Sequence, residues 1–244
     1  MAKKIKDYYN LTCARLIAEK LATVLPNFDS KSFLSELRKT LQGKSYSEKL
    51  DAYAVALAHH LPGTYRDHLH SFESILGPKL TQSNGMFTHG WWLAPLGRYI
   101  ERHGTTDWQA SSAFIHELTQ RYTGEFAIRP LLEARPQKTM QLMLRWSRNK
   151  SVHVRRLSSE GLRPKLPWAK KSLVALQHPD VYQHILTNLC HDTDRFVQKS
   201  VGNNLNDLMK VEPEFARTLI ASWQRAGLSP ATEWIIRHGL RNQK

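Results

Sequence analysis

Apolar residues recur at spacings of three and four along nearly every periodic stretch of this chain, which is the spacing of one buried face of an α-helix. The first stretch runs from Leu11 to Leu25 and ends at Pro26. Further stretches carry glycine, proline or cap signals at one end: Phe33 to Leu41 before Gly43, Leu50 to Leu61 before Pro62, and the segment opened by Ser229 and Pro230. Alternating period-two runs bounded by turn residues are absent from the sequence. The sequence therefore predicts an all-α fold.

The second half of the sequence contains an internal repeat. Residues 154–162 align with residues 197–205 at an offset of 43 residues, and a first helix precedes each segment, at 139–146 and 181–190. A period of about 40–47 residues with two helices per unit is typical of HEAT-like repeats, which stack into a solenoid with a concave face. A non-repetitive helical bundle is the alternative, because the helical period by itself creates chance alignments.

The length and the cysteine content bound the class of protein. A chain of 244 residues buries enough surface to fold without disulfides or a metal. Cys13 and Cys190 cannot form a disulfide framework and fit a reducing, cytoplasmic setting. The chain has no signal-peptide pattern and no run of 18 apolar residues, so we expect no membrane association. We expect one domain over 1–244, with a helical part at 1–110 and the repeat region that carries the site at 111–244.

The charge is the first clue to a partner. The chain has 35 Lys+Arg against 21 Asp+Glu, a formal net charge of +14. Such a surplus indicates a polyanionic partner, and nucleic acid is the most common one. The alternative is a generically basic protein whose charge serves only solubility.

One window concentrates this charge. Residues 145–171 hold nine cations and a single acid, Glu160. The cations are Arg145, Arg148, Lys150, Arg155, Arg156, Arg163, Lys165, Lys170 and Lys171. A carboxylate within a phosphate-binding surface opposes binding unless it stabilises positive charge on a ligand or reaction centre. The alternative for Glu160 is a salt bridge with Arg156 or Arg163.

A rigid loop follows this acid. Pro164 and Pro167 stop the helix and place Trp168 between cations. An exposed tryptophan there would stack on a base or attract a cationic ligand over its ring. The alternative is a core aromatic beneath the next helix.

Two further segments hold candidate acids. Lys199, Asn203 and Asp207 lie four apart and are expected to share one helix face, with Asn206 adjoining, where Asp207 can approach the same ligand as Glu160. The alternative for this face is a solvated polar stripe. The expected core residues of this helix are Phe196, Val197, Val201, Leu205 and Leu208. Glu125 opens a short helix that Gly124 and Pro130 bound, where an acid suits the helix dipole.

A histidine-rich segment raises the question of a metal. It contains His59, His60, Asp67, His68 and His70. The pair His68 and His70 lacks the i, i+4 spacing of helical metal ligands, so we expect no metal site. Glycine-rich phosphate loops, CxxC pairs and a GxSxG elbow are also absent from the sequence, and we expect no cofactor.

Three segments carry a specific resemblance: TGEFAIRPLL (123–132), HVRRLSSEGLRPKLPWA (153–169) and DRFVQKSVGNNLNDLMKVEP (194–213). They resemble the AlkC family of bacterial DNA alkylation repair glycosylases, as do the start of the chain, IKDYYN and PNFD, and its end, WIIRHGL. The chain resembles the short form of the family, without a C-terminal immunoglobulin-like domain. It departs from the family pattern at Gly202, where alanine is expected, and at Gln198, where arginine is usual.

The resemblance implies a HEAT-like repeat solenoid with a concave basic face that excises cationic N-methylated bases from DNA, namely 3-methyladenine and 3-methylcytosine. It places Glu125, Glu160, Trp168 and Asp207 in the active site, and Arg156 and Lys210 among the DNA contacts. Arg155, Arg163, Lys165, Lys199 and Asn203 complete the expected DNA-binding set. A cationic base is already a good leaving group, so an Asp or Glu that stabilises the sugar cation and orients water suffices.

The expected partner is double-stranded DNA that contains alkylated bases, bound by a monomer without an obligate protein partner. The chief alternative is a non-catalytic helical-repeat protein that binds damaged or branched DNA. Such a protein keeps the cations but has no need for Glu160 and Asp207 on the wall that faces DNA. A protein-binding HEAT scaffold is a second alternative, and its function would not depend on the cations of 145–171.

Overall fold

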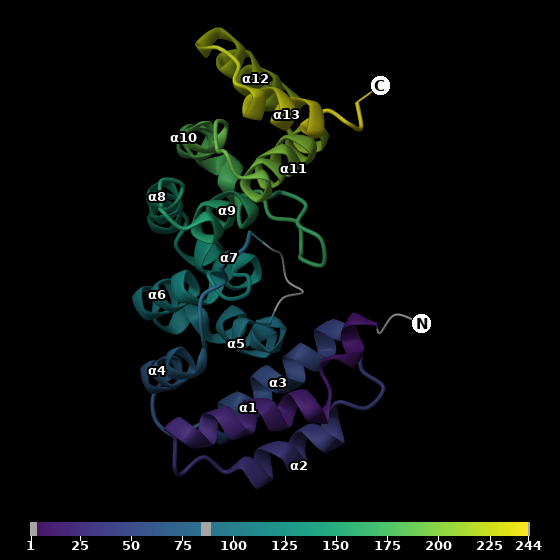
Figure 1. Cartoon of the computed structure of the whole chain (residues 1–244), viewed down its shortest axis with the longest axis vertical. Helices are drawn as coiled ribbons and strands as arrows, with labels where there is room; N and C mark the ends of the chain where they lie inside the picture. Colours follow the sequence, from purple (N-terminus) through teal and green to yellow (C-terminus); the bar gives the residue numbers. More distant parts are fainter. Residues whose placement is uncertain (1–3, 84–88, 244) are drawn as a thin grey trace. The chain divides into compact units, whose positions relative to one another are not determined.

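The computed structural model describes residues 4–83 and 89–243, and this part of the chain contains thirteen α-helices, four short 3-10 helices and no β-strand (Figure 1). The all-α prediction is therefore confirmed. The first seven α-helices are α1 (Leu11–Val24), α2 (Ser30–Thr40), α3 (Tyr46–His60), α4 (Tyr65–Ile75), α5 (Ala94–His103), α6 (Trp108–Thr119) and α7 (Glu125–Ala134). The other six are α8 (Pro136–Trp146), α9 (Val152–Glu160), α10 (Pro179–Leu189), α11 (Arg195–Val211), α12 (Pro213–Ala226) and α13 (Pro230–Gly239). The 3-10 helices are η1 (Ile5–Asp7), η2 (Trp91–Leu93), η3 (Gly104–Thr106) and η4 (Val174–Gln177).

The helices gather into two compact units, made of the described residues of 1–80 with 85–130 and of 81–84 with 131–244. In the first unit α1 packs on α2 and α4, and α3 packs on α2 and α5. Helices α1 to α4 and α6 of this unit begin at side-chain caps, because the first backbone N–H groups of a helix need acceptors. Asn10 accepts from the backbone of α1, and Ser45 forms a reciprocal capping box with Glu48 at the start of α3. These local signals explain why the predicted N-terminal helices are present.

The bounds predicted for the helix at Glu125 were wrong at its C-terminal end. The helix begins at Glu125 as expected, but Pro130 lies inside it and the helix continues to Ala134. Proline has no N–H to donate to the carbonyl of Phe126, so one helical hydrogen bond is lost there. Ile128 and Leu131 are fully buried on either side of the proline, and this packing keeps the helix continuous.

The second unit contains the predicted repeat. The helices α8 and α10 begin at Pro136 and Pro179, and α9 and α11 begin at Val152 and Arg195, so both helices of the second pair start 43 residues after their counterparts. The first helices contact each other, as do the second helices. Figure 1 shows α8 and α10 along one side of this unit and α9 and α11 along the other. The two-helix repeat with its 43-residue offset is therefore present.

The core of the second unit follows the helical spacing, with one exception. Val197, Val201, Leu205 and Leu208 of α11 are fully buried, as predicted. Phe196 is only partly buried. Its ring lies 4.9 Å from the Arg156 guanidinium carbon and contacts the edge of His153, so it supports basic side chains instead of the core.

Two glycines allow α11 and α13 to approach closely. A Cβ on Gly239 would lie 2.6 Å from Leu205 Cβ, and a Cβ on Gly202 would lie 2.8 Å from His238 Cδ2. Gly202 is the position where the family pattern leads one to expect alanine. The glycine gives the His238 ring the space to stack on Trp234, at a centroid separation of 4.7 Å.

The histidine-rich segment is dispersed over different partners. His59 Nδ1 and His60 Nε2 lie 3.2 and 2.9 Å from the Glu36 carboxylate, and His68 Nδ1 lies 2.6 Å from the Tyr99 hydroxyl. Asp67 instead caps the start of α4. Over residues 4–83 and 89–243 no group of three or more His, Cys, Asp or Glu side chains is placed to hold a metal ion. Within the same residues no helix has the length and apolar character needed to cross a bilayer.

Candidate active site

Two predicted acids from neighbouring repeat units meet on one arginine. Glu160 is the last residue of α9, Arg163 follows in the next loop, and Asp207 lies in the C-terminal half of α11. Arg163 Nη1 donates to Glu160 Oε1 at 2.8 Å, and Arg163 Nε donates to Asp207 Oδ2 at 3.0 Å. A guanidinium carries donors in a fixed planar fork, so one Arg163 side chain holds both carboxylates at once. The folded chain thus brings Glu160 and Asp207 together.

The proline-containing loop closes the site from one side. The backbone N–H of Lys165 donates to Asp207 Oδ2 at 3.2 Å, and the N–H of Ser172 donates back to the carbonyl of Pro164 at 3.2 Å. Pro164 and Leu166 are buried, while the Lys165 side chain is exposed. The loop therefore contributes a backbone donor to the acids and a cationic side chain to solvent.

A buried polar chain that was not predicted supports Glu160. Ser200 of α11 donates to Glu160 Oε2 at 2.7 Å, and its Oγ lies 2.6 Å from Ser159 Oγ. Asn204 donates to the carbonyl of Ser159 and accepts from the Tyr182 hydroxyl. The sequence pattern could have predicted these partners. Ser200, Asn204 and Asp207 are polar residues at i, i+4 and i+7, which is the spacing of a single helix face.

This arrangement corrects the predicted face of α11. Lys199, Asn203 and Asp207 have different surroundings: Asn203 Oδ1 lies 3.1 Å from Nε2 of His238 in α13 and accepts from Arg241 Nη2. Lys199 is exposed, whereas Asp207 is buried against the loop after α9. A residue four positions on is rotated about 40° further around a helix, so the two steps from Lys199 to Asp207 turn the side chain by about 80°.

The acids and Arg163 form a buried group of charges. Glu160 is 4%, Asp207 4% and Arg163 8% exposed. Burial by itself raises the pKa of Glu160, but the charges of Arg156 and Arg163 and the Ser200 hydrogen bond outweigh it and hold that pKa below its usual value. Burial lowers the pKa of Arg163, and the two acids raise it above the usual value. Glu160 and Arg163 are therefore both ionised at neutral pH. The salt bridges considered for Glu160 are present, since Arg156 Nη2 also lies 3.4 Å from Glu160 Oε1.

Trp168 lies at the surface and outside the core. It is 67% exposed and its backbone φ is 63°, in the left-handed region that side chains other than glycine seldom occupy. The conformation turns the chain back after Pro167, so that the N–H of Ala169 bonds to the carbonyl of Leu166 at 3.2 Å. An exposed indole on a loop that also donates to Asp207 suits contact with a ligand.

Glu125 belongs to the first unit and is 2% exposed at the first position of α7. A carboxylate at the first turn of a helix is stabilised by the free N–H groups and the helix dipole. Its location at a helix start agrees with the prediction.

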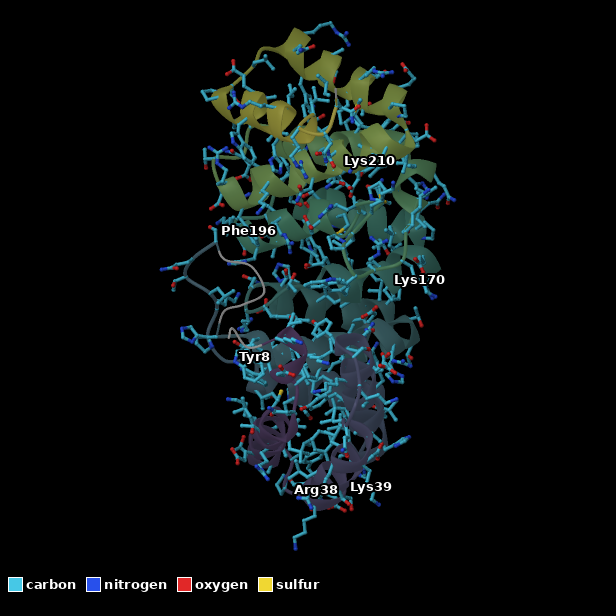
Figure 2. The ribbon with its side chains drawn as sticks, turned by 90° about the vertical axis from the view of Figure 1, so that its right-hand side faces the viewer. Tyr8, Arg38, Lys39, Lys170, Phe196 and Lys210 are labelled. Atoms are coloured by element: carbon cyan, nitrogen blue, oxygen red, sulfur yellow. The ribbon has the colours of Figure 1, made fainter. Side chains whose placement is uncertain are left out.

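The predicted DNA contacts divide into exposed and internally bonded side chains. Lys165, Lys199 and Lys210 are exposed, and Lys210 Nζ also donates to Asn206 Oδ1 at 2.7 Å. Figure 2 labels Phe196 and Lys210 near the two ends of α11 and Lys170 in the loop after α9. Arg155 forms an ion pair with Asp192 at 2.6 Å and also donates to the carbonyls of Asn149 and Lys150.

Gln198 also bonds within the chain. It is 5% exposed, and its Nε2 donates to the carbonyl of Asp192 at 2.7 Å. The departure from arginine at this position therefore lies in the interior of the unit and not on its surface.

Comparisons with known proteins identify chains that are similar to this one. Residues 123–242 match the model of the DNA alkylation repair enzyme family. The chain is 33% identical over 238 residues to the uncharacterized protein YhaZ of Bacillus subtilis (strain 168), covering 97% of this chain and 64% of that protein. It is 32% identical, with a TM-score of 0.86, to the structure of Pseudomonas fluorescens alkylpurine DNA glycosylase AlkC bound to DNA containing an abasic site analog. That match covers 99% of this chain and 65% of AlkC, so the chain spans about two-thirds of the length of both relatives.

The crystal structure of AlkD2 from Streptococcus mutans is similar in fold, with a TM-score of 0.54 and 13% identity over 86% of this chain and 96% of that one. The matched family segment, 123–242, includes Glu125, Glu160, Trp168 and Asp207. The chain belongs to the DNA alkylation repair enzyme family.

Proposed function

We propose that this chain is a DNA glycosylase of base excision repair that hydrolyses the N-glycosidic bond of cationic N-methylated bases, 3-methyladenine and 3-methylcytosine. The observation that carries the proposal is the pair of acids, Glu160 and Asp207, joined through Arg163; the loop that donates to Asp207 also carries the exposed Trp168. The similarity of this chain to the alkylpurine DNA glycosylase AlkC supports the same assignment.

The chemistry of a cationic base suits these side chains. A 3-methylated base carries a positive charge and leaves as a neutral molecule, so little acid catalysis is needed. Bond cleavage leaves positive charge on the deoxyribose, as in other oxocarbenium-like transition states. A carboxylate stabilises that charge and orients the attacking water. The Trp168 ring attracts a cationic base more strongly than a neutral one, and this preference contributes to the choice of lesion.

The remaining cations serve to hold DNA in this proposal. The second helices of the repeat units and the loop after α9 form the concave basic face of a HEAT-like solenoid, with Lys165, Lys199 and Lys210 directed at phosphates. Arg156 lies between the acids and this face, because it contacts both Glu160 and the Phe196 ring. Arg163, which is bonded to both acids, positions them instead of contacting phosphates.

The family resemblance also assigns Glu125, which opens α7 in the first unit, a role in base excision. The chain acts as a monomer on double-stranded DNA in the cytoplasm.

The test is release of methylated bases from alkylated duplex DNA by the wild-type chain, Glu160→Gln and Asp207→Asn. Both substitutions keep side-chain shape and remove one charge. We expect wild type to release 3-methyladenine, and at least one variant to lose release while DNA binding persists. Tight, salt-sensitive DNA binding without base release by the wild type would instead favour a non-catalytic DNA-binding protein, with both acids serving as salt-bridge partners of Arg163.

A further inference from the structure

A row of basic and aromatic side chains lies along the contact between α11 and α13. Arg195, Lys199 and Asn203 follow one another at intervals of four on α11. The Arg195 guanidinium carbon lies 4.1 Å from the centre of the Trp234 ring of α13, and the Trp234 ring stacks on His238 at a centroid separation of 4.7 Å. The stack of Arg195, Trp234 and His238 therefore holds the imidazole in a fixed plane.

One asparagine fixes which nitrogen of His238 carries a hydrogen. Asn203 Oδ1 lies 3.1 Å from His238 Nε2 and accepts from Arg241 Nη2 at 3.1 Å. An amide oxygen only accepts, so Nε2 is the protonated nitrogen of the neutral ring and Nδ1 keeps its lone pair. Within residues 4–83 and 89–243 no hydrogen bond reaches His238 Nδ1, and this atom is not fully buried. Nδ1 is therefore available to a partner from solution.

The charges around this ring are all positive. Arg195, Lys199 and Arg241 are exposed, and in the described part of the chain none of them is paired with a carboxylate. Burial and the charges of Arg241 and Lys199 lower the pKa of His238 below its usual value. His238 is therefore neutral at pH 7, and an anion beside Lys199 and Arg241 would favour its protonation.

Gly202 of α11 makes the space for the ring. A Cβ at this position would lie 2.8 Å from His238 Cδ2 and 3.3 Å from His238 Cβ, so a methyl group would push the ring away from Asn203. Gly202 is also where the sequence departs from the family pattern, in which alanine is expected. The position of the His238 ring thus depends on a residue particular to this chain.

We propose that Lys199, His238 and Arg241 form a binding site for a phosphate group of the DNA backbone, and that His238 takes up one proton when the phosphate binds. The inference rests on the DNA binding of the proposed function and is independent of base release. The proton comes from solvent and enters at Nδ1, which then donates to a phosphate oxygen. The phosphate in turn offsets the charges of Lys199 and Arg241. DNA should therefore bind more tightly as the pH falls.

The first experiment measures the affinity for an undamaged duplex against pH at constant ionic strength. Between about pH 7.5 and pH 6 we expect wild type to gain about fivefold more affinity than His238→Gln, since uptake of one proton changes affinity by up to about tenfold per pH unit. His184→Gln, which removes an exposed histidine of α10, is the control and should keep the wild-type pH dependence. The same pH dependence in His238→Gln as in wild type would overturn the proposal.

The second experiment follows the proton in the wild-type chain by NMR titration of the His238 ring. We expect the pKa of His238 to rise when the undamaged duplex binds. Inorganic phosphate is the second arm: a rise with phosphate as well would show that the site recognises the phosphate group itself. A rise with inorganic phosphate and none with the duplex would refute the assignment to the DNA backbone. An unchanged pKa in both arms would refute the site.

Gly202→Ala tests the position of the ring. The added methyl group should abolish the pH dependence of DNA affinity as His238→Gln does, and thermal unfolding shows whether the variant is folded. A folded Gly202→Ala with wild-type pH dependence would contradict the proposal. Proton-linked binding by a wild-type chain that releases no methylated base would refute the proposed glycosylase and leave this phosphate site in place.

Discussion

Arg163 Nε and Asp207 Oδ2 lie 3.0 Å apart although the residues are 44 positions apart in the chain, so one buried side chain ties the loop after α9 to α11. Removal of this guanidinium leaves two carboxylates buried without their shared partner. Arg163→Met is therefore expected to lower the free energy of unfolding by about 3–5 kcal/mol, measured by urea denaturation at pH 7. Arg217→Met is the control, because Arg217 and Glu214 form an ion pair with both side chains mostly exposed.

The ion pair between Glu160 and Arg163 predicts a pH dependence of stability. Burial raises the pKa of Glu160, but Arg156 and Arg163 outweigh it, so this pKa is lower in the folded chain than in the unfolded one. The stabilisation is then present above the unfolded value of about 4.3 and is lost as the pH falls through the folded value. The difference in unfolding free energy between wild type and Arg163→Met should shrink below about pH 4. A difference that grows on acidification would contradict the ionised state of Glu160.

Trp168 should affect base excision and not stability. The ring is 67% exposed, so Trp168→Ala removes little buried surface. Loss of a cation–π contact worth about 1–2 kcal/mol predicts a fall of roughly tenfold in single-turnover release of the cationic base. Trp168→Gly should lose activity equally while its melting temperature stays the same or rises, because glycine adopts the φ of 63° without strain. A marked drop in melting temperature for Trp168→Ala would show that the ring serves packing.

The close approach of α11 and α13 predicts a high cost for one methyl group. Gly239→Ala places a Cβ 2.6 Å from Leu205 Cβ, and we expect a loss of about 1–3 kcal/mol in unfolding free energy from overpacking. Gly97→Ala in α5 is the matched control, since its Cβ would meet Leu118 Cδ2 at an ordinary 3.6 Å. Urea denaturation of the two variants should separate them clearly. Equal stabilities would mean that the helices move apart without cost.

Salt dependence distinguishes lysines that contact DNA from arginines that hold the fold. Each phosphate contact contributes about 0.9 to the slope of log K against log salt concentration. Lys199→Gln and Lys210→Gln should each reduce the slope by about this amount. Arg155→Gln should leave the slope unchanged and lower stability, because Arg155 is bonded to Asp192. Lys31→Gln, at an exposed lysine of α2, is the control for an unspecific effect of charge.

Much of the fold could be predicted because its signals are local. The spacing of Leu11 to Leu25, the caps at Ser45 and Ser229 and the match of Val154 to Val197 each depend on a few neighbouring residues. Pro130 was misinterpreted because burial of Ile128 and Leu131 outweighs one missing hydrogen bond, and burial is a tertiary property.

The acids, the Arg163 salt bridge and the exposed Trp168 could be predicted, but the polar residues that support the acids were not. Glu160 and Asp207 stand out as charges in the repeat, but Ser200 and Asn204 become polar partners only when the rotation of α11 is known. That rotation depends on Gly202 and Gly239, which allow α13 to pack closely on one side of α11. Helical spacing alone grouped Lys199 and Asn203 with Asp207, whereas the packing of α13 on α11 brings Asn203 to His238 of α13.

The central claim is that this chain removes a cationic base from DNA by hydrolysis. The most direct measurement is single-turnover incubation of the wild-type chain with duplex DNA that contains 3-methyladenine, followed by mass spectrometry of both the free base and the strand. We predict free 3-methyladenine and an equal amount of an intact strand with an abasic site, formed at a rate far above spontaneous depurination. DNA that is fully bound and releases base no faster than in buffer would contradict the account.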